Sequence, residues 1–452
     1  MLASFSRDAA PFWVTACSRG SPLFFFAPLP IQPEAVVYIK ARDEILVLFF
    51  GLLAWLVFLR ACEEKNRKVL WSVLAGMLSL AACLSKESGI VFPGVLAGAL
   101  FLLHGRKVFL RAWMPLLFQG LAVAFYFGIH AVVIGGNPVP KGEILYFGQN
   151  PLGYMPPNFI PWTALELLFV SVSKTFFPLN LSATYGFAHL PLIGSPFGHW
   201  MSPAGMVTVL LLLLLLVLPR VRKSPLGIGA MVFLILYFPF SKIPFYQSID
   251  FFAERWLYGP SAGLSMIAGF LLWLVWKYYR AAAPMLFTAI AVAYLFVLLP
   301  RNTIWRNTTT LGESLVRNAP NSVVSYVFLA NDRLQYGRLE EATALITSGL
   351  RITREHIPLH HIAASVAMAA RNLQVAEQAV AAAEELGGDE LANVILRSTL
   401  LAKQHQYQES LNHLLASKWF HPEEHRIRML LALNLWMLGR HDEARPYLDW
   451  EL

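Results

Sequence analysis

The 452-residue chain is 56% hydrophobic and 14% charged, which is too apolar for a soluble globular protein and too long for one domain. Its net charge of +8 does not indicate a nucleic-acid partner, because many Lys and Arg residues stand in short clusters beside apolar blocks, where they orient membrane helices. We therefore expect an all-α chain in which a polytopic helical membrane domain precedes a soluble helical domain.

The first predicted segment, residues 1–33, is irregular and a candidate for aberrant sequence. Its apolar patch from Leu23 to Leu29 is broken by proline and has neither a basic lead nor a small-residue cleavage site. We do not expect a signal peptide here.

The membrane domain is predicted over residues 34–300 from its apolar blocks. A helix needs about 20 residues to cross the hydrocarbon core. Eight blocks of suitable length and composition follow one another: 45–59, 69–84, 88–103, 112–134, 203–218, 226–240, 258–276 and 283–299. A ninth stretch, 161–178, contains Glu166 and Lys174, and we expect it to be an amphipathic helix at the membrane interface.

The loops between these blocks predict the orientation. One set is short and rich in Lys and Arg: 60–68, 104–112, 219–225 and 277–282. The opposite set is longer and poorer in them: 40–43, 85–87, 135–202 and 242–257. Twelve basic residues in the short loops against seven in the long ones place the short loops in the cytoplasm. Residues 301–452 then follow the last span on the side opposite the cytoplasm.

Three groups of charged residues stand at the outer ends of predicted spans. Charges there are costly unless they are paired or functional. The members precede the first span, occupy a tight turn between two spans, or precede the seventh span: Arg42 and Asp43, Lys86 and Glu87, and Glu254 and Arg255. Since all three groups lie on the same side, they can converge on one site, although interfacial anchors and local salt bridges explain them equally well.

Internal repeats define the predicted soluble domain, residues 301–452. Small residues recur at a spacing of 34, which is the tetratricopeptide period: Ala342, Ala376, Ser410 and Ala444. A small side chain is required where the two helices of a repeat approach most closely. Gly337 and Gly439 fall in the predicted turns, where glycine permits a positive φ. We expect an α-solenoid that binds peptides or partner proteins.

No cofactor or metal site is predicted. His360, His361, His421 and His425 lack Cys or acidic partners at metal-ligand spacing. The sequence also lacks the glycine-rich motifs of nucleotide-binding proteins and the GxSxG motif of serine hydrolases.

Five blocks resemble one protein family. They are "PIQPEAVVYIKARDEILVLFFGLLAWLVFLR" at 30–60, "LAACLSKESGIVFPGVLAGALFL" at 80–102, "FFPLNLSATYGFAHLPL" at 176–192, "FFAERWLYGPSAGL" at 251–264 and "RNTIWRNTTTLGESLVRNAPNSVVSYVFLAN" at 301–331. These resemble the transmembrane and tetratricopeptide-repeat-containing O-mannosyltransferases and their bacterial relatives.

The resemblance implies a GT-C glycosyltransferase of the membrane, in bacteria the inner membrane. A polyprenyl- or dolichyl-phosphate-linked sugar, typically mannose, would be donated to Ser or Thr hydroxyls outside the cytoplasm. The family has an outside loop with paired acidic residues that supply a general base before the block that begins here at Pro30. Within residues 1–29 the only acidic residue is Asp8. This departure predicts that the chain is a truncated or frame-shifted reading of a longer gene. The catalytic base is therefore unknown.

On this reading the outer-end residues bind the donor. Arg42, Lys86 and Arg255 would neutralise the lipid phosphate, while Asp43, Glu87 and Glu254 would orient these cations or contact sugar hydroxyls. Two alternatives remain open: a polymerase or ligase of surface glycans, and a non-catalytic membrane-anchored scaffold in which only the repeats act.

Overall fold

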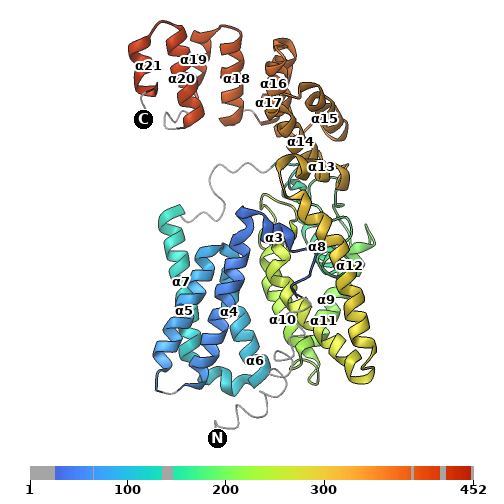
Figure 1. The fold of residues 1–452 in the computed structure, drawn as a ribbon. Helices are drawn as coiled ribbons and strands as arrows, with labels where there is room; N and C mark the ends of the chain where they lie inside the picture. Colours follow the sequence, from blue (N-terminus) through green and yellow to red (C-terminus); the bar gives the residue numbers. More distant parts are fainter. Residues whose placement is uncertain (1–25, 65, 135–145, 388–390, 418–423, 449–452) are drawn as a thin grey trace. The chain divides into compact units, whose positions relative to one another are not determined.

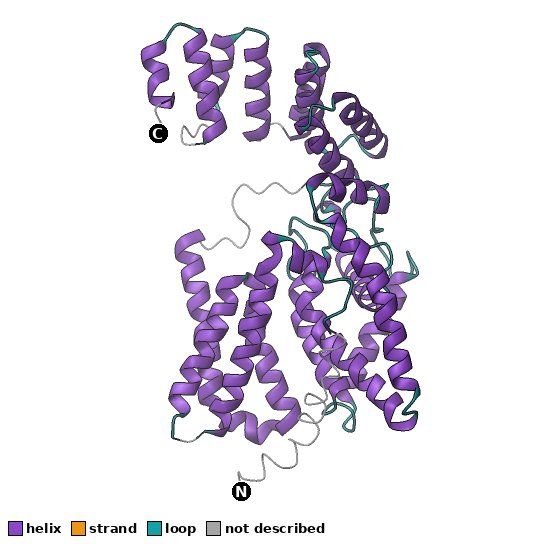
Figure 2. Ribbon diagram, in the orientation of Figure 1, coloured by secondary structure: helices purple, strands orange, loops and turns teal. Residues whose placement is uncertain are grey.

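The computed structural model describes residues 26–64, 66–134, 146–387, 391–417 and 424–448. Within these ranges the chain is all-α, and the one β pairing is an isolated antiparallel bridge between Tyr185 and Phe252 (Figure 2). The chain divides into two compact units. Unit 1 contains residues 1–145, 150–185 and 190–307, and unit 2 contains residues 146–149, 186–189 and 308–452. The predicted fold class is confirmed.

Unit 1 is a bundle of apolar helices (Figure 1). Its α-helices are α3 (Pro33–Val37), α4 (Arg42–Glu63), α5 (Lys68–Ser85), α6 (Phe92–Arg111), α7 (Trp113–Ile134), α8 (Phe159–Phe176), α9 (Met201–Val217), α10 (Pro225–Tyr237), α11 (Tyr258–Tyr278) and α12 (Ala282–Ile304). Short 3-10 helices join them: η1 (Ile39–Ala41), η2 (Glu87–Val91), η3 (Pro151–Tyr154), η4 (Phe238–Phe240) and η5 (Glu254–Leu257).

Seven helical stretches among the described residues are long and apolar enough to cross a membrane. They contain α4, α5, α6, α7, α8, α11 and α12, counting the 3-10 turns that continue three of them. Helix α9 has 17 residues and α10 has 13, so both are shorter than a span of typical length. The chain is therefore a polytopic membrane protein.

Helix α8 differs from its prediction as an interfacial helix. It is 18 residues long and meets the length and hydropathy of a span. The charge that suggested an amphipathic helix, Glu166, has no exposed surface and faces the protein. Because Glu166 is inside, it does not make the outer surface of the helix polar, and sequence alone does not reveal the direction of that side chain.

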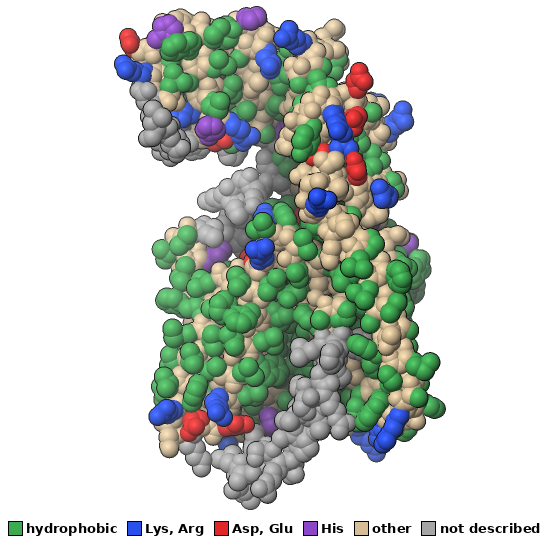
Figure 3. Space-filling model, viewed as in Figure 1, with side chains coloured by type: hydrophobic (Ala, Val, Ile, Leu, Met, Phe, Trp, Pro, Cys, Tyr) green, Lys and Arg blue, Asp and Glu red, His purple; other side chains and the backbone are tan. Residues whose placement is uncertain are grey.

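The two ends of the bundle carry different groups of charges. At one end His104 of α6 interacts electrostatically with Lys223 and Glu63, and Lys68 donates a hydrogen bond to the carbonyl of Arg111. These residues belong to three of the four short basic loops, which thus lie together. Figure 3 shows hydrophobic side chains along the flanks of the helices, with Lys and Arg gathered at their ends.

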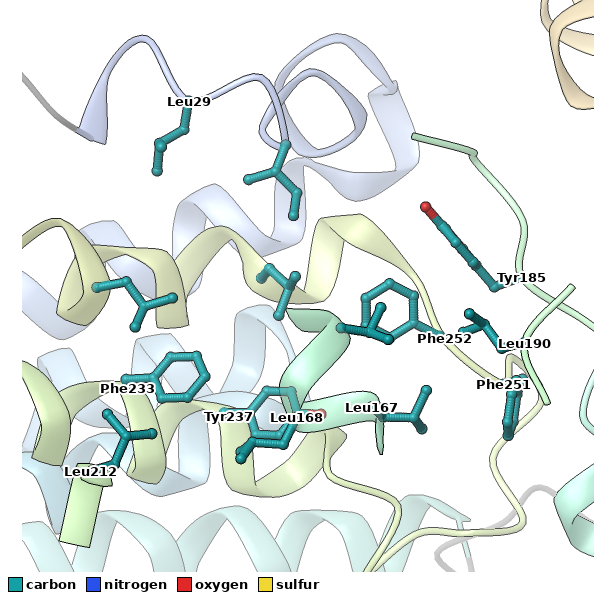
Figure 4. Close-up of a cluster of buried hydrophobic side chains, with 14 of the residues drawn as sticks. Leu29, Leu167, Leu168, Tyr185, Leu190, Leu212, Phe233, Tyr237, Phe251 and Phe252 are labelled. Carbon is teal, nitrogen blue, oxygen red and sulfur yellow. The ribbon is translucent and has the colours of Figure 1, made fainter. Parts of the chain in front are cut away.

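The core of unit 1 joins helices α8 to α12 to the segment that precedes α3. Leu29 and Ile31 are buried in this core with Leu167, Phe233 and Phe251 (Figure 4). The described part of the predicted N-terminal segment, residues 26–33, is thus packed into the membrane unit. Its first 25 residues lie outside the described chain.

Unit 2 is an array of helix pairs preceded by α13 (Thr308–Asn318). The pairs are α14 (Val323–Gln335) with α15 (Leu339–Ile352), α16 (Ile357–Ala369) with α17 (Leu373–Gly387), α18 (Leu391–Lys403) with α19 (Tyr407–Ala416), and α20 (His425–Met437) with α21 (His441–Leu448). Two segments from between the membrane helices belong to this unit, since Phe187 donates a backbone hydrogen bond to Gly148 at 2.9 Å and Tyr146 packs on His356.

The four small residues at 34-residue spacing occupy the same place in each pair. Ala342, Ala376, Ser410 and Ala444 lie in the first turn of α15, α17, α19 and α21, and none has any exposed surface. The Ser410 hydroxyl donates to the carbonyl of Ser398 at 2.8 Å and accepts from the side-chain amide of Asn434 at 2.8 Å. Ser410 therefore tolerates burial because both partners satisfy its hydroxyl.

The turns inside the four pairs share a left-handed residue, again at a spacing of 34. Gly337, Arg371, His405 and Gly439 have φ of 69°, 59°, 64° and 77°. In each turn the next N–H donates a hydrogen bond back to a carbonyl five residues earlier, as Asn372 does to Ala367 at 2.9 Å. The positive φ predicted for both glycines is confirmed. Arg371 and His405 adopt it despite their side chains.

Replacing Arg371 by glycine should stabilise the repeat unit by about 0.5–1 kcal/mol, because glycine removes the strain of a Cβ at positive φ. The converse change, Gly337→Ala, should cost about 1 kcal/mol. Amide hydrogen exchange of unit 2 in the full chain measures both. Arg351→Gly, which lies in helix α15, is the matched control and should destabilise; stabilisation there as well would show that loss of arginine, not φ, is responsible.

Candidate functional site

Lys86 lies where α5 ends and binds the first turn of α4. Its backbone is extended, and its Nζ contacts Glu44 Oε1 at 2.7 Å and Asp43 Oδ2 at 3.0 Å. Glu44 is buried, whereas the Asp43 side chain is 32% exposed. The lysine is therefore a held cation with one accessible acidic neighbour.

Gly89 makes this turn tight. A Cβ at Gly89 would stand 2.4 Å from the carbonyl carbon and oxygen of Ala82, so only glycine lets η2 pack against the end of α5. The turn holds the Lys86 backbone at the end of the bundle. From there the Lys86 side chain reaches the start of α4.

Arg255 lies in η5 and is held by two carboxylates. Its backbone N–H and Nη1 donate to Glu34 of α3 at 3.0 and 2.5 Å, and its Nη2 pairs with Asp250. Glu34 is 1% exposed and Arg255 is 21% exposed. The side chain of Arg255 is therefore held at two nitrogen atoms and remains partly exposed.

These groups form one continuous cluster. Burial raises the pKa of Glu34 to about 7, with a further increase from the charge of Glu254 and an opposing decrease from Arg255. Arg255 also interacts electrostatically with Glu44, the partner of Lys86. The structure therefore brings Asp43, Lys86 and Arg255 to the same end of unit 1, at the end opposite the short basic loops.

Glu254 belongs to a separate buried network beneath this cluster. Its carboxylate pairs with Arg301 of α12 and accepts hydrogen bonds from the Tyr185 hydroxyl and from the Ser182 N–H. Glu254 has no exposed surface, and Arg301 is 5% exposed. With both oxygens occupied by protein partners, Glu254 ties η5 to the last helix of the bundle.

Arg42 and Glu87 are placed differently from the other predicted residues. Both side chains are exposed, and neither makes an ion pair with another described residue. Arg42 begins α4 and Glu87 begins η2, next to Asp43 and Lys86 respectively. They surround the cluster without belonging to its ion pairs.

Sequence reasoning missed Glu34, Asp250 and Arg301. Glu34 stands in the apolar context "QPEAVV", where a single carboxylate is expected either to have a function or to pair with a cation elsewhere in the chain. Its position in the first family-like block was the available signal. Among the described residues, no group of three or more His, Cys, Asp or Glu side chains is arranged to hold a metal ion.

Comparison with known proteins gives a distant relative. No family model matches the chain. It is 26% identical to Protein O-mannosyl-transferase TMTC4 of Mus musculus, over 67% of this chain and 45% of that protein. The chain is similar to an O-mannosyl-transferase. It spans about half the length of this mannosyl-transferase relative.

A solved structure, the crystal structure of yeast Tom70, aligns with 85% of this chain and 83% of its own. The sequence identity is 14% and the TM-score is 0.28. A score this low does not support a comparison of helix arrangements.

Proposed function

We propose that the chain is a membrane glycosyltransferase that moves a sugar, with mannose the first candidate, from a polyprenyl- or dolichyl-phosphate donor to Ser or Thr hydroxyls of proteins. The observation that supports it is the pair of partly exposed, carboxylate-held cations, Lys86 and Arg255, at one end of the bundle. The similarity to an O-mannosyl-transferase favours this chemistry over other uses of a cationic cluster.

The two cations suit a lipid phosphate. As the sugar leaves, negative charge grows on the phosphate, and a fixed cation stabilises it without reorganising at the moment of reaction. Asp43 and Glu34 keep the cations oriented before the donor arrives. The partly exposed side chains of Lys86 and Arg255 then contact the phosphate, while Arg42 and Glu87 lie at the margin for the phosphate and the sugar hydroxyls.

The role proposed for the repeat unit is to bind the acceptor polypeptide. Tetratricopeptide arrays present a surface of stacked helices on which extended or helical polypeptides bind. An array joined to the last membrane helix would raise the local concentration of acceptor segments near the cluster. We infer that unit 2 binds the acceptor polypeptide or a partner that carries it.

The proposed orientation places unit 2 outside the cytoplasm, in bacteria on the outer side of the inner membrane. A reporter active only outside the cytoplasm should be active when fused after Leu452 and inactive when fused after Lys223, which belongs to a short basic loop. Activity limited to the Lys223 fusion would reverse the orientation and remove the case for an extracytoplasmic transferase.

The function is tested with the full chain in lipid nanodiscs. Polyprenyl-phosphate mannose should bind, and its sugar should appear on a Ser/Thr-containing peptide. Polyprenyl phosphate without sugar tests whether the phosphate group provides the binding. If polyprenyl-phosphate mannose does not bind, the proposal is refuted.

Two alternatives have distinct outcomes in the same experiment. A surface-glycan polymerase or ligase would transfer sugar to a glycan and not to the peptide. A non-catalytic scaffold would bind polypeptides through unit 2 without binding the donor.

A further inference from the structure

Lys242 is a buried lysine in the segment that connects η4 to η5. Its side chain is 1% exposed, and its backbone has φ of 66°, the left-handed region that disfavours residues with a Cβ. Burial of an amine and positive φ both cost stability. Residues that persist at such a cost are concentrated at functional sites.

The contacts of Lys242 hold this segment together. Its Nζ donates to Ser248 Oγ at 2.5 Å and to the carbonyl of Asp250, and it lies 4.9 Å from the centroid of the Trp256 ring. From the other side, the Asn150 amide donates to the carbonyls of Tyr246 and Ser248 at 2.8 and 2.5 Å. Residues 241–252 are thus fixed at several points.

Two of these contacts lead to Arg255. Asp250 accepts from Lys242 through its backbone carbonyl and pairs with Arg255 through its carboxylate. Trp256 lies under both cations, with the Arg255 guanidinium carbon 5.9 Å from the ring centroid. Lys242 therefore touches both groups that support the Arg255 side chain besides Glu34.

The charge of Lys242 is sensitive to pH. Burial lowers the pKa of Lys242 to about 7, and the charge of Asp250 opposes this decrease. Two further charged groups belong to the same ion-pair network: Arg255, which pairs with Asp250, and Glu34, which pairs with Arg255. Below neutral pH Lys242 is an ammonium ion, and above it a neutral amine, which donates weaker hydrogen bonds and loses its attraction to the Trp256 ring.

We propose that Lys242 is a positioning residue for Arg255: its ammonium ion holds segment 241–252 against Trp256, and loss of that proton loosens the contact of Asp250 with Arg255. The consequence for catalysis rests on the proposed function. Donor binding at Arg255 would then weaken as pH rises through neutrality.

The test uses the full chain in nanodiscs, labelled with 5-fluorotryptophan. The ¹⁹F line of Trp256, identified by its loss in Trp256→Phe, should shift with a midpoint near pH 7 between about pH 5.5 and 8.5. Lys242→Met should abolish the shift, Lys242→Arg should keep the low-pH position throughout, and Glu34→Gln should leave the shift intact. The proposal would be overturned if the Trp256 line did not shift with pH, or if it shifted equally in Lys242→Met. It would also be overturned if Glu34→Gln abolished the shift and Lys242→Met did not.

A second measurement follows the segment itself. At the low-pH end of this range, where Lys242 is protonated in the parent, amide hydrogen exchange of residues 241–253 should be at least several-fold faster in Lys242→Met than in the parent or Lys242→Arg. Equal exchange in all three would also overturn the proposal. Both readouts need no donor, so they separate failure of this inference from failure of the glycosyltransferase assignment, which donor binding tests independently.

Discussion

Arg255→Ala should lower sugar transfer by about 10- to 1,000-fold, the range expected for removing one preorganised charge-stabilising contact. Arg255 is held by Glu34 and Asp250 and its side chain is 21% exposed, so the charge is in place before the donor binds. Lys86→Ala should lower transfer over the same range, since Asp43 and Glu44 hold Lys86 in the same way. Transfer and donor affinity are measured on the same preparations.

The matched control is Lys277→Ala, at the other end of the helix that follows Arg255. Lys277 contacts Trp273 and Tyr278 and should be dispensable for transfer. Removing Arg255 also leaves Glu34 without its cation, so correct folding is checked by the elution profile and thermal midpoint. Parental transfer rates in folded Arg255→Ala and Lys86→Ala proteins would make both residues structural anchors and refute the proposed donor site.

Arg301→Met should destabilise unit 1 by about 3–5 kcal/mol, because it leaves the buried Glu254 without its counter-charge. The hydrogen bonds from Tyr185 and Ser182 cannot replace a cation. Thermal unfolding of the full chain in detergent, followed through the protease resistance of the membrane unit, measures the loss.

The double variant Glu254→Gln with Arg301→Met removes both charges and should recover a large part of the lost stability. Pairing a neutral amide with Tyr185 and Ser182 costs much less than burying a lone carboxylate. If the double variant is no more stable than Arg301→Met, the ion pair is not the source of the effect.

The repeats were predictable because their signal is local and periodic. The 34-residue spacing of small residues predicted both the helix pairs and the buried positions, and two glycines predicted the turns. Arg371 and His405 were not predicted in the left-handed conformation, since neither residue type favours it. The common hydrogen-bonding pattern of the turn overrides that preference.

The site was only partly predictable because its ion pairs join distant parts of the chain. Charges at the ends of spans could be recognised one at a time, but their partners lie 42 residues away for Lys86 and Glu44, and 221 residues away for Arg255 and Glu34. No spacing rule relates such positions. Glu254 and Arg255 are adjacent in sequence and were predicted to share one site, whereas in the structure the Glu254 carboxylate pairs with Arg301.

The pairing of Glu34 with Arg255 also has a consequence for biosynthesis. Ribosomes add about 5–20 residues per second, so the 221 residues between the two partners require on the order of 10–45 s of synthesis. During that interval the nascent chain carries the Glu34 side chain, which is buried in the final structure, but not yet Arg255, with which it pairs. The cationic cluster is thus completed only when η5 emerges from the ribosome, and a nascent chain arrested before that point exposes an unpaired carboxylate to the factors that survey newly inserted membrane proteins.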